Sequence, residues 1–128
     1  MKKLVPILLA LLLCGCGANQ PQPTYRQATA QEAAALMEEE SGYILLDVRT
    51  AGEYAEAHIP GAVNLANEDI GSEAPPELPD KEQLILVYCR SGNRSKQASA
   101  KLVELGYTNV VEFGGINDWT GETVSGEA

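Results

Sequence analysis

Apolar and polar residues alternate in short blocks along most of the chain, and the spacing of these blocks predicts its secondary structure. Short runs that are apolar and rich in β-branched residues predict buried strands. Blocks of strong helix formers between them predict helices. The predicted strands are residues 43–48, 62–65, 84–88 and 110–113, and the predicted helices are residues 33–40, 50–57 and 96–105, followed by a helical turn at 116–119.

The residues that border these blocks predict where the helices begin and end. Thr29 followed by Glu32 has the spacing of a capping box, and Thr50 suits the N-cap of a second helix. Gly106 suits the end of the third helix. Elsewhere we expect irregular structure, namely a loop with at most one helical turn at 67–80, a loop at 90–95, a turn at 114–115 and a loose polar tail from 120.

The predicted strands and helices alternate over about 100 residues, and this order is typical of one α/β domain. We expect a central, mainly parallel sheet with helices on both faces, formed by residues 25–124, and a loose tail at 125–128. Ligand sites in such sheets lie beyond the carboxyl ends of the strands. Cys89 follows the most apolar predicted strand, so it is expected at this edge.

The first residues are predicted to be a targeting signal rather than part of the fold. Lys2 and Lys3 precede an apolar run of ten residues, which suits a signal peptide and is too short to span a bilayer. Leu13, Gly15 and Cys16 stand at the −3, −1 and +1 positions of a pattern that resembles the lipobox of bacterial lipoproteins. The resemblance implies removal of residues 1–15, a lipid on Cys16 and a flexible tether at 16–24. A plain secretory signal is the alternative.

This interpretation places the mature protein outside the cytoplasm, held at a membrane through the lipid on Cys16. Loss of Lys2 and Lys3 from the 9 basic residues leaves 7 against 18 acidic ones, a net charge of −11. Such a charge does not favour anionic lipid, so the acyl chains must provide the anchoring. Cys89 is then the only free thiol, because Cys14 leaves with the signal and Cys16 is capped.

The composition of the whole chain excludes several classes of function. The chain has 128 residues, of which 45% are hydrophobic, and its net charge is −9. Nucleic-acid binding is not expected, because it needs a basic face. The 3 cysteines are too few for a disulfide scaffold, and with 1 histidine there is no cluster with metal-ligand spacing. We therefore expect no metal.

The segment from Cys89 to Ser95 carries the residues best suited to chemistry. A thiol is nucleophilic only as the thiolate, and its free pKa is about 8.5. Arg90 and Arg94 favour an anion, Gly92 allows a tight turn, and a loop before a helix can direct backbone N–H groups at the sulfur. The sequence therefore predicts Cys89 as the catalytic residue, in a cradle for sulfur or an oxyanion formed by Arg90, Ser91, Gly92, Asn93, Arg94 and Ser95.

Four blocks of the sequence resemble the signatures of the rhodanese-like family of single-domain thiosulfate sulfurtransferases. They are residues 46–49 with Glu53, residues 58–62, residues 89–95, and residues 114–116 with Trp119. The resemblance covers about residues 25–124. It implies the three-layer rhodanese fold and a sulfurtransferase of the EC 2.8.1 class.

In the mechanism that the resemblance implies, the Cys89 thiolate takes the outer sulfur of thiosulfate or of a persulfide donor. The Cys89 persulfide then passes this sulfur to a thiol or to cyanide, as in other covalent catalysis with two half-reactions. No cofactor is implied. The expected partners are small sulfur donors and thiol acceptors, and we expect a monomer.

Other residues in these blocks have structural interpretations. Asp47 and Arg49 are candidates to line the site, but a buried ion pair that fixes the loop is the favoured reading. His58 is expected to pack a loop, because a cysteine with a lowered pKa needs no base. Trp119 is expected in the core or as a lid. For all four residues, the sequence favours packing over chemistry.

Two other functions are alternatives to sulfur transfer. Cysteine phosphatases and arsenate reductases have an arginine six residues after the cysteine, whereas here Ser95 takes that place and Arg94 comes one residue earlier. The shorter loop suits one sulfur atom better than a tetrahedral phosphate. A carrier or redox-sensing module that holds a persulfide without turnover remains the alternative to an enzyme.

Overall fold

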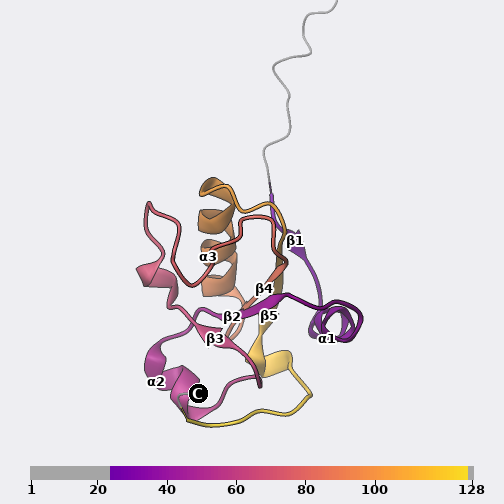
Figure 1. Cartoon of the computed structure of the whole chain (residues 1–128). Coiled ribbons are helices and arrows are strands. Elements are labelled where there is room, and N and C mark those ends of the chain that lie inside the picture. The colour runs from indigo at the N-terminus through magenta and orange to yellow at the C-terminus, as the bar shows by residue number, and fades with distance from the viewer. Residues whose placement is uncertain (1–23, 127–128) are drawn as a thin grey trace, which may run out of the picture.

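The computed structural model describes residues 24–126, which form a five-stranded sheet (Figure 1). The strands lie in the order β1-β5-β4-β2-β3, and every neighbouring pair is parallel. Their bounds are β1 Arg26–Gln27, β2 Ile44–Asp47, β3 Val63–Asn64, β4 Ile85–Cys89 and β5 Val110–Gly115. The longest strands therefore lie at the centre of the sheet and the two-residue strands at its edges.

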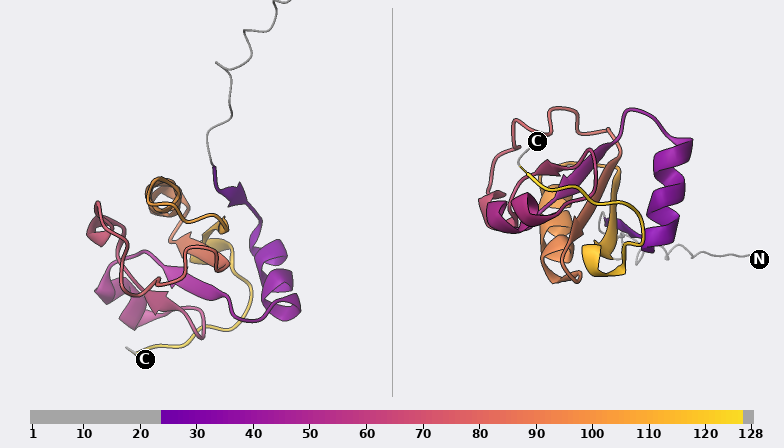
Figure 2. Two further views of the ribbon diagram at one scale, coloured as in Figure 1. Left: turned by 45° about the horizontal axis from the view of Figure 1, so that its top comes forward. Right: turned by 90° about the horizontal axis from the view of Figure 1, so that it is seen from below.

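Helices cover both faces of this sheet, as two further views show (Figure 2). Their bounds are α1 Ala30–Glu39, α2 Ala51–Glu56 and α3 Asn93–Glu104, with short 3₁₀ turns η2 Asn67–Asp69 and η3 Ile116–Asp118. One core cluster joins α3 to Leu46, Val87 and Cys89, and the other joins α1 and α2 to Leu86 and Tyr88. Alternate residues of β4 thus face opposite layers.

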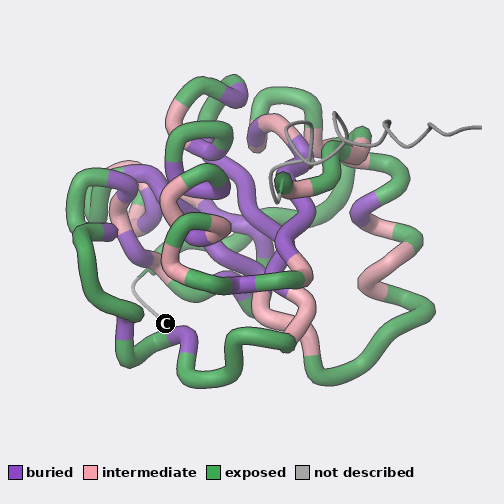
Figure 3. The backbone as a smooth tube through the Cα atoms, turned by 90° about the horizontal axis from the view of Figure 1, so that it is seen from above, coloured by how far each residue is buried: buried purple, intermediate pink, exposed green. Residues whose placement is uncertain are grey.

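Burial follows the same three layers, with the inner strands buried and the outer helix faces exposed (Figure 3). All five residues of β4 are buried, because this strand has a neighbour on each side and a helix layer on each face. The predicted α/β class with a parallel central sheet is confirmed. Within residues 24–126, no helix combines the length and apolarity that a bilayer crossing requires.

The predicted helix starts are confirmed at both threonine caps. Thr29 accepts from the backbone N–H of Glu32, whose side chain accepts from the N–H of Thr29. Thr50 and Glu53 make the same reciprocal pair at α2. Each capping box satisfies two backbone donors that a helix end would otherwise leave unpaired. Local sequence therefore determines these two boundaries.

The structure differs from the sequence prediction at β1, at residues 114–115 and in the C-terminal tail. The sequence pattern does not predict β1, because its two residues are exposed and polar and its partner β5 is distant in the sequence. The turn expected at residues 114–115 is instead the end of β5. The segment from Thr120 is not loose as far as Val124, because Val124 pairs with His58 in an antiparallel bridge.

Candidate active site

Cys89 is the last residue of β4 and lies at the carboxyl edge of the sheet, as predicted. Its side chain is buried, with the residue 1% exposed. The backbone N–H of Gly92 donates to Sγ at 3.0 Å, and the hydroxyl of Ser95 lies 3.4 Å from Sγ. Gly92 has a φ of 118°, a left-handed conformation that turns the chain from the strand into α3. The sulfur therefore sits at the N-terminal end of a 12-residue helix.

The surroundings of the sulfur favour its anionic form. Burial alone would raise the pKa of the Cys89 thiol, because desolvation disfavours the thiolate. Hydrogen bonds from the Ser95 side chain and from the backbone N–H groups of Ser95, Gly92 and Ser91 outweigh burial and lower the pKa. These hydrogen bonds come from three of the six residues predicted to form the cradle, and their result is a thiol that ionises more readily than usual.

The loop after Cys89 is shorter than predicted, because α3 begins at Asn93 rather than at residue 96. Arg94 and Ser95 are therefore in the first turn of the helix. Polar residues are common in the first turn of a helix, where the backbone N–H groups are free. Because the same residues are common in loops, the segment resembles a loop in the sequence. Gly92 and Ser95 are buried beside the sulfur, whereas Arg90, Ser91 and Asn93 are exposed at the rim.

Gly115 of β5 leaves room for the backbone of this loop. A Cβ atom on Gly115 would lie 1.9 Å from the carbonyl oxygen of Arg90 and 2.6 Å from the nitrogen of Ser91. The same carbonyl accepts from the N–H of Asn117 at 3.1 Å. The register between β4 and β5 shifts between Val87 and Cys89, and Cys89 pairs with Gly115. Only glycine permits this close approach of strand and loop.

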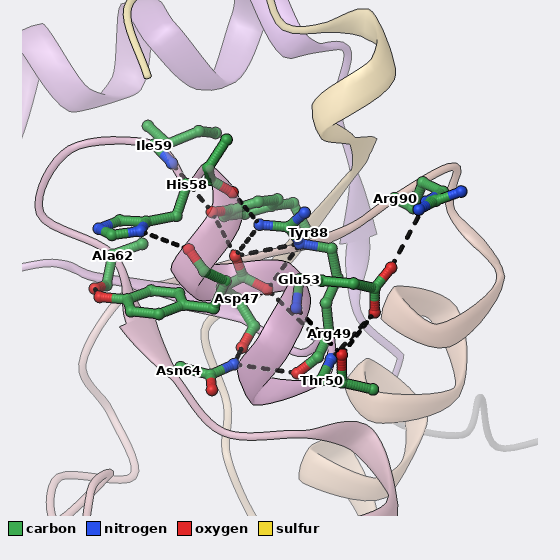
Figure 4. A network of polar contacts seen from close by, with 12 residues as sticks. Asp47, Arg49, Thr50, Glu53, His58, Ile59, Ala62, Asn64, Tyr88 and Arg90 are labelled. Carbon is green, nitrogen blue, oxygen red and sulfur yellow. Dashed lines mark hydrogen bonds and ion pairs between the residues drawn. The ribbon is translucent and has the colours of Figure 1, made fainter. Parts of the chain in front are cut away.

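The two arginines of the segment point to Glu53 of α2, which Figure 4 shows beside Arg90. Arg94 donates to both carboxylate oxygens of Glu53, at 2.7 and 3.1 Å, and Arg90 lies 3.4 Å from the carboxylate. The hydrogen bond from Arg94 lowers the pKa of Glu53 to about 2. The arginines therefore form a cationic rim that is partly neutralised by Glu53, and the hydrogen bonds to the sulfur make the larger contribution at Cys89.

Asp47 and Arg49 form the buried ion pair that the sequence favoured (Figure 4). Their closest atoms are 2.7 Å apart, and the Tyr88 hydroxyl donates to the same carboxylate at 2.7 Å. Arg49 also donates to the carbonyl of Ala57, and Tyr88 accepts from the N–H of Ile59. This network joins the loop after α2 to the strand that ends in Cys89, and burial and Asp47 raise the pKa of Tyr88.

The packing roles predicted for His58 and Trp119 are confirmed. His58 is fully buried, stacks on Tyr54 with ring centroids 3.7 Å apart, and its Nδ1 lies 2.8 Å from the carbonyl of Tyr54. Trp119 packs against Phe113 and donates to the carbonyl of Glu122 at 3.0 Å. Both rings therefore support the loops around the site.

The sequence reasoning missed two acidic residues. Glu53 appeared only as part of a family signature, and its place beside the arginines depends on the packing of α2 against α3. Glu112 is the more revealing omission, because it is a charged residue inside an apolar strand and is 2% exposed. Its Oε2 lies 2.5 Å from the hydroxyl of Ser95. The signal that could have identified Glu112 from the sequence is a single acidic residue within an apolar strand.

The predicted absence of a metal site is tested only in part by the described residues, and the predicted lipoprotein signal is not tested by them. Within residues 24–126, no group of three or more histidine, cysteine or acidic side chains is arranged to hold a metal ion. The signal peptide, the lipidated Cys16 and most of the tether lie outside the described residues. Those assignments stay predictions.

Comparisons with known proteins identify relatives of this chain. The profile of a family described as "Rhodanese-like domain" matches residues 29–122. The thiosulfate sulfurtransferase PspE of Escherichia coli is 37% identical over 57% of this chain and 70% of its own length. The thiosulfate sulfurtransferase GlpE of Pseudomonas entomophila is 34% identical over 81% of this chain and 96% of its own. Other matched relatives are longer, and the chain spans about a quarter of their length.

A solved structure also resembles this fold. The structure described as rhodanese with anions from E. coli superposes with a TM-score of 0.61 and 34% sequence identity. The match covers 66% of this chain and 99% of that one. Sequence and structure comparisons thus agree on one family.

Proposed function

This chain belongs to the rhodanese-like domain family, and on that premise we propose that it is a sulfurtransferase that carries sulfane sulfur on Cys89. Its relatives support sulfur transfer in general, since two of them are thiosulfate sulfurtransferases. The observation that supports the role of Cys89 most strongly is its cradle. Its sulfur is buried at a helix N-terminus, accepts the N–H of Gly92 at 3.0 Å, and has a lowered pKa.

In the first half-reaction, the Cys89 thiolate attacks the outer sulfur of thiosulfate. A bond forms between Sγ and this sulfur, the sulfur–sulfur bond of thiosulfate breaks, and sulfite leaves with the electron pair. The outer sulfur of the new persulfide carries the negative charge, which the backbone N–H groups of the segment and the N-terminal end of α3 stabilise. The charge of the protein is unchanged by this step, because a thiolate becomes a persulfide anion.

In the second half-reaction, a thiolate or cyanide attacks the outer sulfur. The bond between the two sulfurs of the persulfide breaks, and Cys89 regains its thiolate. Two half-reactions through one covalent intermediate give ping-pong kinetics. Arg90 and Arg94 attract the anionic donor to the rim, and this attraction weakens as salt is added.

The persulfide can be tested directly by mass spectrometry. The purified full chain is incubated with thiosulfate, and its intact mass is compared with that of Cys89→Ala, which keeps Cys14 and Cys16. We expect the gain of one sulfur atom in the wild type, no gain in the variant, and loss of the sulfur on addition of cyanide. A reduced Cys89 that gains no sulfur contradicts the proposal. Loading without turnover to small thiols favours a carrier.

We extend the proposal to the location of the protein, as a lipoprotein anchored outside the cytoplasm through Cys16. The support is the arrangement of Leu13, Gly15 and Cys16 after an apolar run. Labelling of cells with a clickable fatty acid, followed by capture of the chain, is the test. We expect label on the wild type and none on Cys16→Ser, and unlabelled wild type contradicts the anchor.

A further inference from the structure

Glu112 is a buried acid that the mechanism above does not use. It lies in β5 between the apolar residues Val111 and Phe113, which face the layer of α1. Because side chains alternate along a strand, Glu112 points to the opposite layer, where α3 begins. It pairs in register with Val87, two residues before Cys89. The strand therefore directs a carboxyl group to the back of the candidate active site.

One serine hydroxyl lies between this carboxyl group and the sulfur. Sγ of Cys89 is 3.4 Å from Oγ of Ser95, and Oγ is 2.5 Å from Oε2 of Glu112. The N–H of Gly114 donates to the same Oε2 at 2.8 Å, and the side chain of Gln27 donates to Oε1 at 3.2 Å. Ser95 is fully buried. The carboxyl group is thus held in place and linked to Cys89 by two consecutive contacts.

The hydroxyl of Ser95 has one hydrogen, and this limits the protonation states of the cluster. In one state, the Cys89 thiol donates to Oγ while Ser95 donates to an ionised Glu112. In the other, a protonated Glu112 donates to Oγ while Ser95 donates to the Cys89 thiolate. Each state uses both contacts once, in preference to the backbone carbonyls of Gly92 and Gly114, which lie 3.0 and 3.2 Å from Oγ of Ser95. The two states interconvert when one proton moves along each contact.

We propose that Glu112 accepts the proton of Cys89 through Ser95 and thereby generates the thiolate. The S–H bond breaks, its proton joins Oγ of Ser95, and the hydroxyl proton of Ser95 moves to Oε2 of Glu112. No electrons leave the cluster and its net charge is unchanged. Glu112 acts through Ser95 and is in this sense a positioning residue. The inference rests on the proposed role of Cys89.

Cys89 and Glu112 disfavour each other's charge. A thiolate and a carboxylate separated by one hydroxyl in a buried site repel each other, so the state with both groups ionised is disfavoured. Two other charged residues, Lys96 of α3 and Asp118 of η3, line the same hollow as Glu112. At the rim, Arg94 is paired with Glu53. If the proposed relay operates, the thiolate fraction stays constant between the loss of the first and of the second proton of the cluster.

The alkylation rate of Cys89 tests this prediction. The full chain is treated with iodoacetamide at a series of pH values, and the peptide that contains Cys89 is quantified by mass spectrometry. The wild type should show two rising steps separated by a plateau. Glu112→Gln should show one step and lose the plateau, because below its midpoint a lone thiol loses about tenfold in rate for each pH unit.

Two serines of α3 provide a matched pair of variants. Ser95→Ala should also give one step, and Ser95→Thr, which keeps a hydroxyl, should restore the plateau. Ser99 lies one turn further along α3, is fully buried, and its Oγ has no hydrogen-bond partner among the described residues. Ser99→Ala should therefore keep both steps. This pair decides the question even where Glu112→Gln does not fold.

Two results overturn the inference. The first is a wild type with one step that Glu112→Gln leaves in place, since Glu112 is then structural only. The second is one step that moves to lower pH in Glu112→Gln, since Glu112 is then only a fixed charge. The assay needs no sulfur donor. Two steps without persulfide formation therefore refute the proposed function alone, and persulfide formation with one step refutes the relay alone.

Discussion

The close approach of Gly115 to the Cys89 loop makes Gly115→Ala the sharpest test of how the site is held. The new Cβ would lie 1.9 Å from the carbonyl oxygen of Arg90 and 2.2 Å from its carbonyl carbon. Ordinary contact needs about 3.5 Å, so the loop must move by roughly 1.5 Å. The contact is with backbone rather than with a flexible side chain, so no rotamer change can relieve it.

Both stability and activity should respond. Overpacking of this kind costs about 1–3 kcal/mol, and the Tm of a domain of this size falls by roughly 4–8 °C for each kcal/mol. A shift of about 1 Å at a catalytic group lowers the rate by on the order of a hundredfold. We therefore expect Gly115→Ala to fold with a lower Tm and to lose about two orders of magnitude in kcat/KM.

The adjacent glycine provides the comparison. Gly114 has a φ of 88°, and a Cβ there would meet no atom within 4 Å. Gly114→Ala therefore adds left-handed strain of about 1–2 kcal/mol without a clash. Thermal unfolding and the rate of thiocyanate formation from thiosulfate and cyanide are measured for both variants. The reasoning is refuted if Gly115→Ala is folded and fully active, or if Gly114→Ala loses as much activity.

Three further predictions concern the charged residues. Arg94→Ala should raise the KM for thiosulfate more than the KM for an uncharged trisulfide donor, and equal changes would contradict the electrostatic role of the rim. Arg94 lowers the pKa of Glu53 to about 2, so the stability from this contact is present above the unfolded-state pKa of Glu53 and is lost as the pH falls towards 2. Between pH 7 and pH 3, the free energy of unfolding measured with denaturant should therefore fall more for the wild type than for Glu53→Gln. The difference should be about 1 kcal/mol, because the pair is partly exposed. Equal losses would argue against this contribution of the contact. Asp47→Asn leaves the buried charge of Arg49 and the hydroxyl of Tyr88 without their carboxylate, and urea unfolding should show a loss of about 3–5 kcal/mol, whereas a loss below about 1 kcal/mol would mean that the ion pair is dispensable.

Local patterns predicted the regular part of the fold well. The apolar runs that became β2, β4 and β5 are continuous because both faces of a parallel sheet are covered. The two threonine caps are equally local. The strand β1 could not be predicted in the same way, since it has only two polar residues and its partner strand is more than 80 residues away.

The part of the site that lies in one continuous segment could be predicted from the sequence. Cys89 at a strand end, with Gly92 and a helix after it, follows from the sequence alone. Contacts between distant segments do not follow from the sequence, and they change which groups bind the arginines and the serine of that segment. Glu53 lies 41 residues from Arg94 and Glu112 lies 17 residues from Ser95. Both arginines bind an acid of α2, and the serine is bound to an acid of β5.

The two-residue strands at the edges of the sheet have a consequence for crowded surroundings. An exposed edge offers unpaired backbone groups to which a second molecule can add a strand, and long flat edges promote aggregation. Here β1 and β3 are each only two residues long, and one of the two residues of β1 is an arginine. We therefore expect the domain to resist edge-to-edge association even at high protein concentration, and to remain monomeric in light scattering.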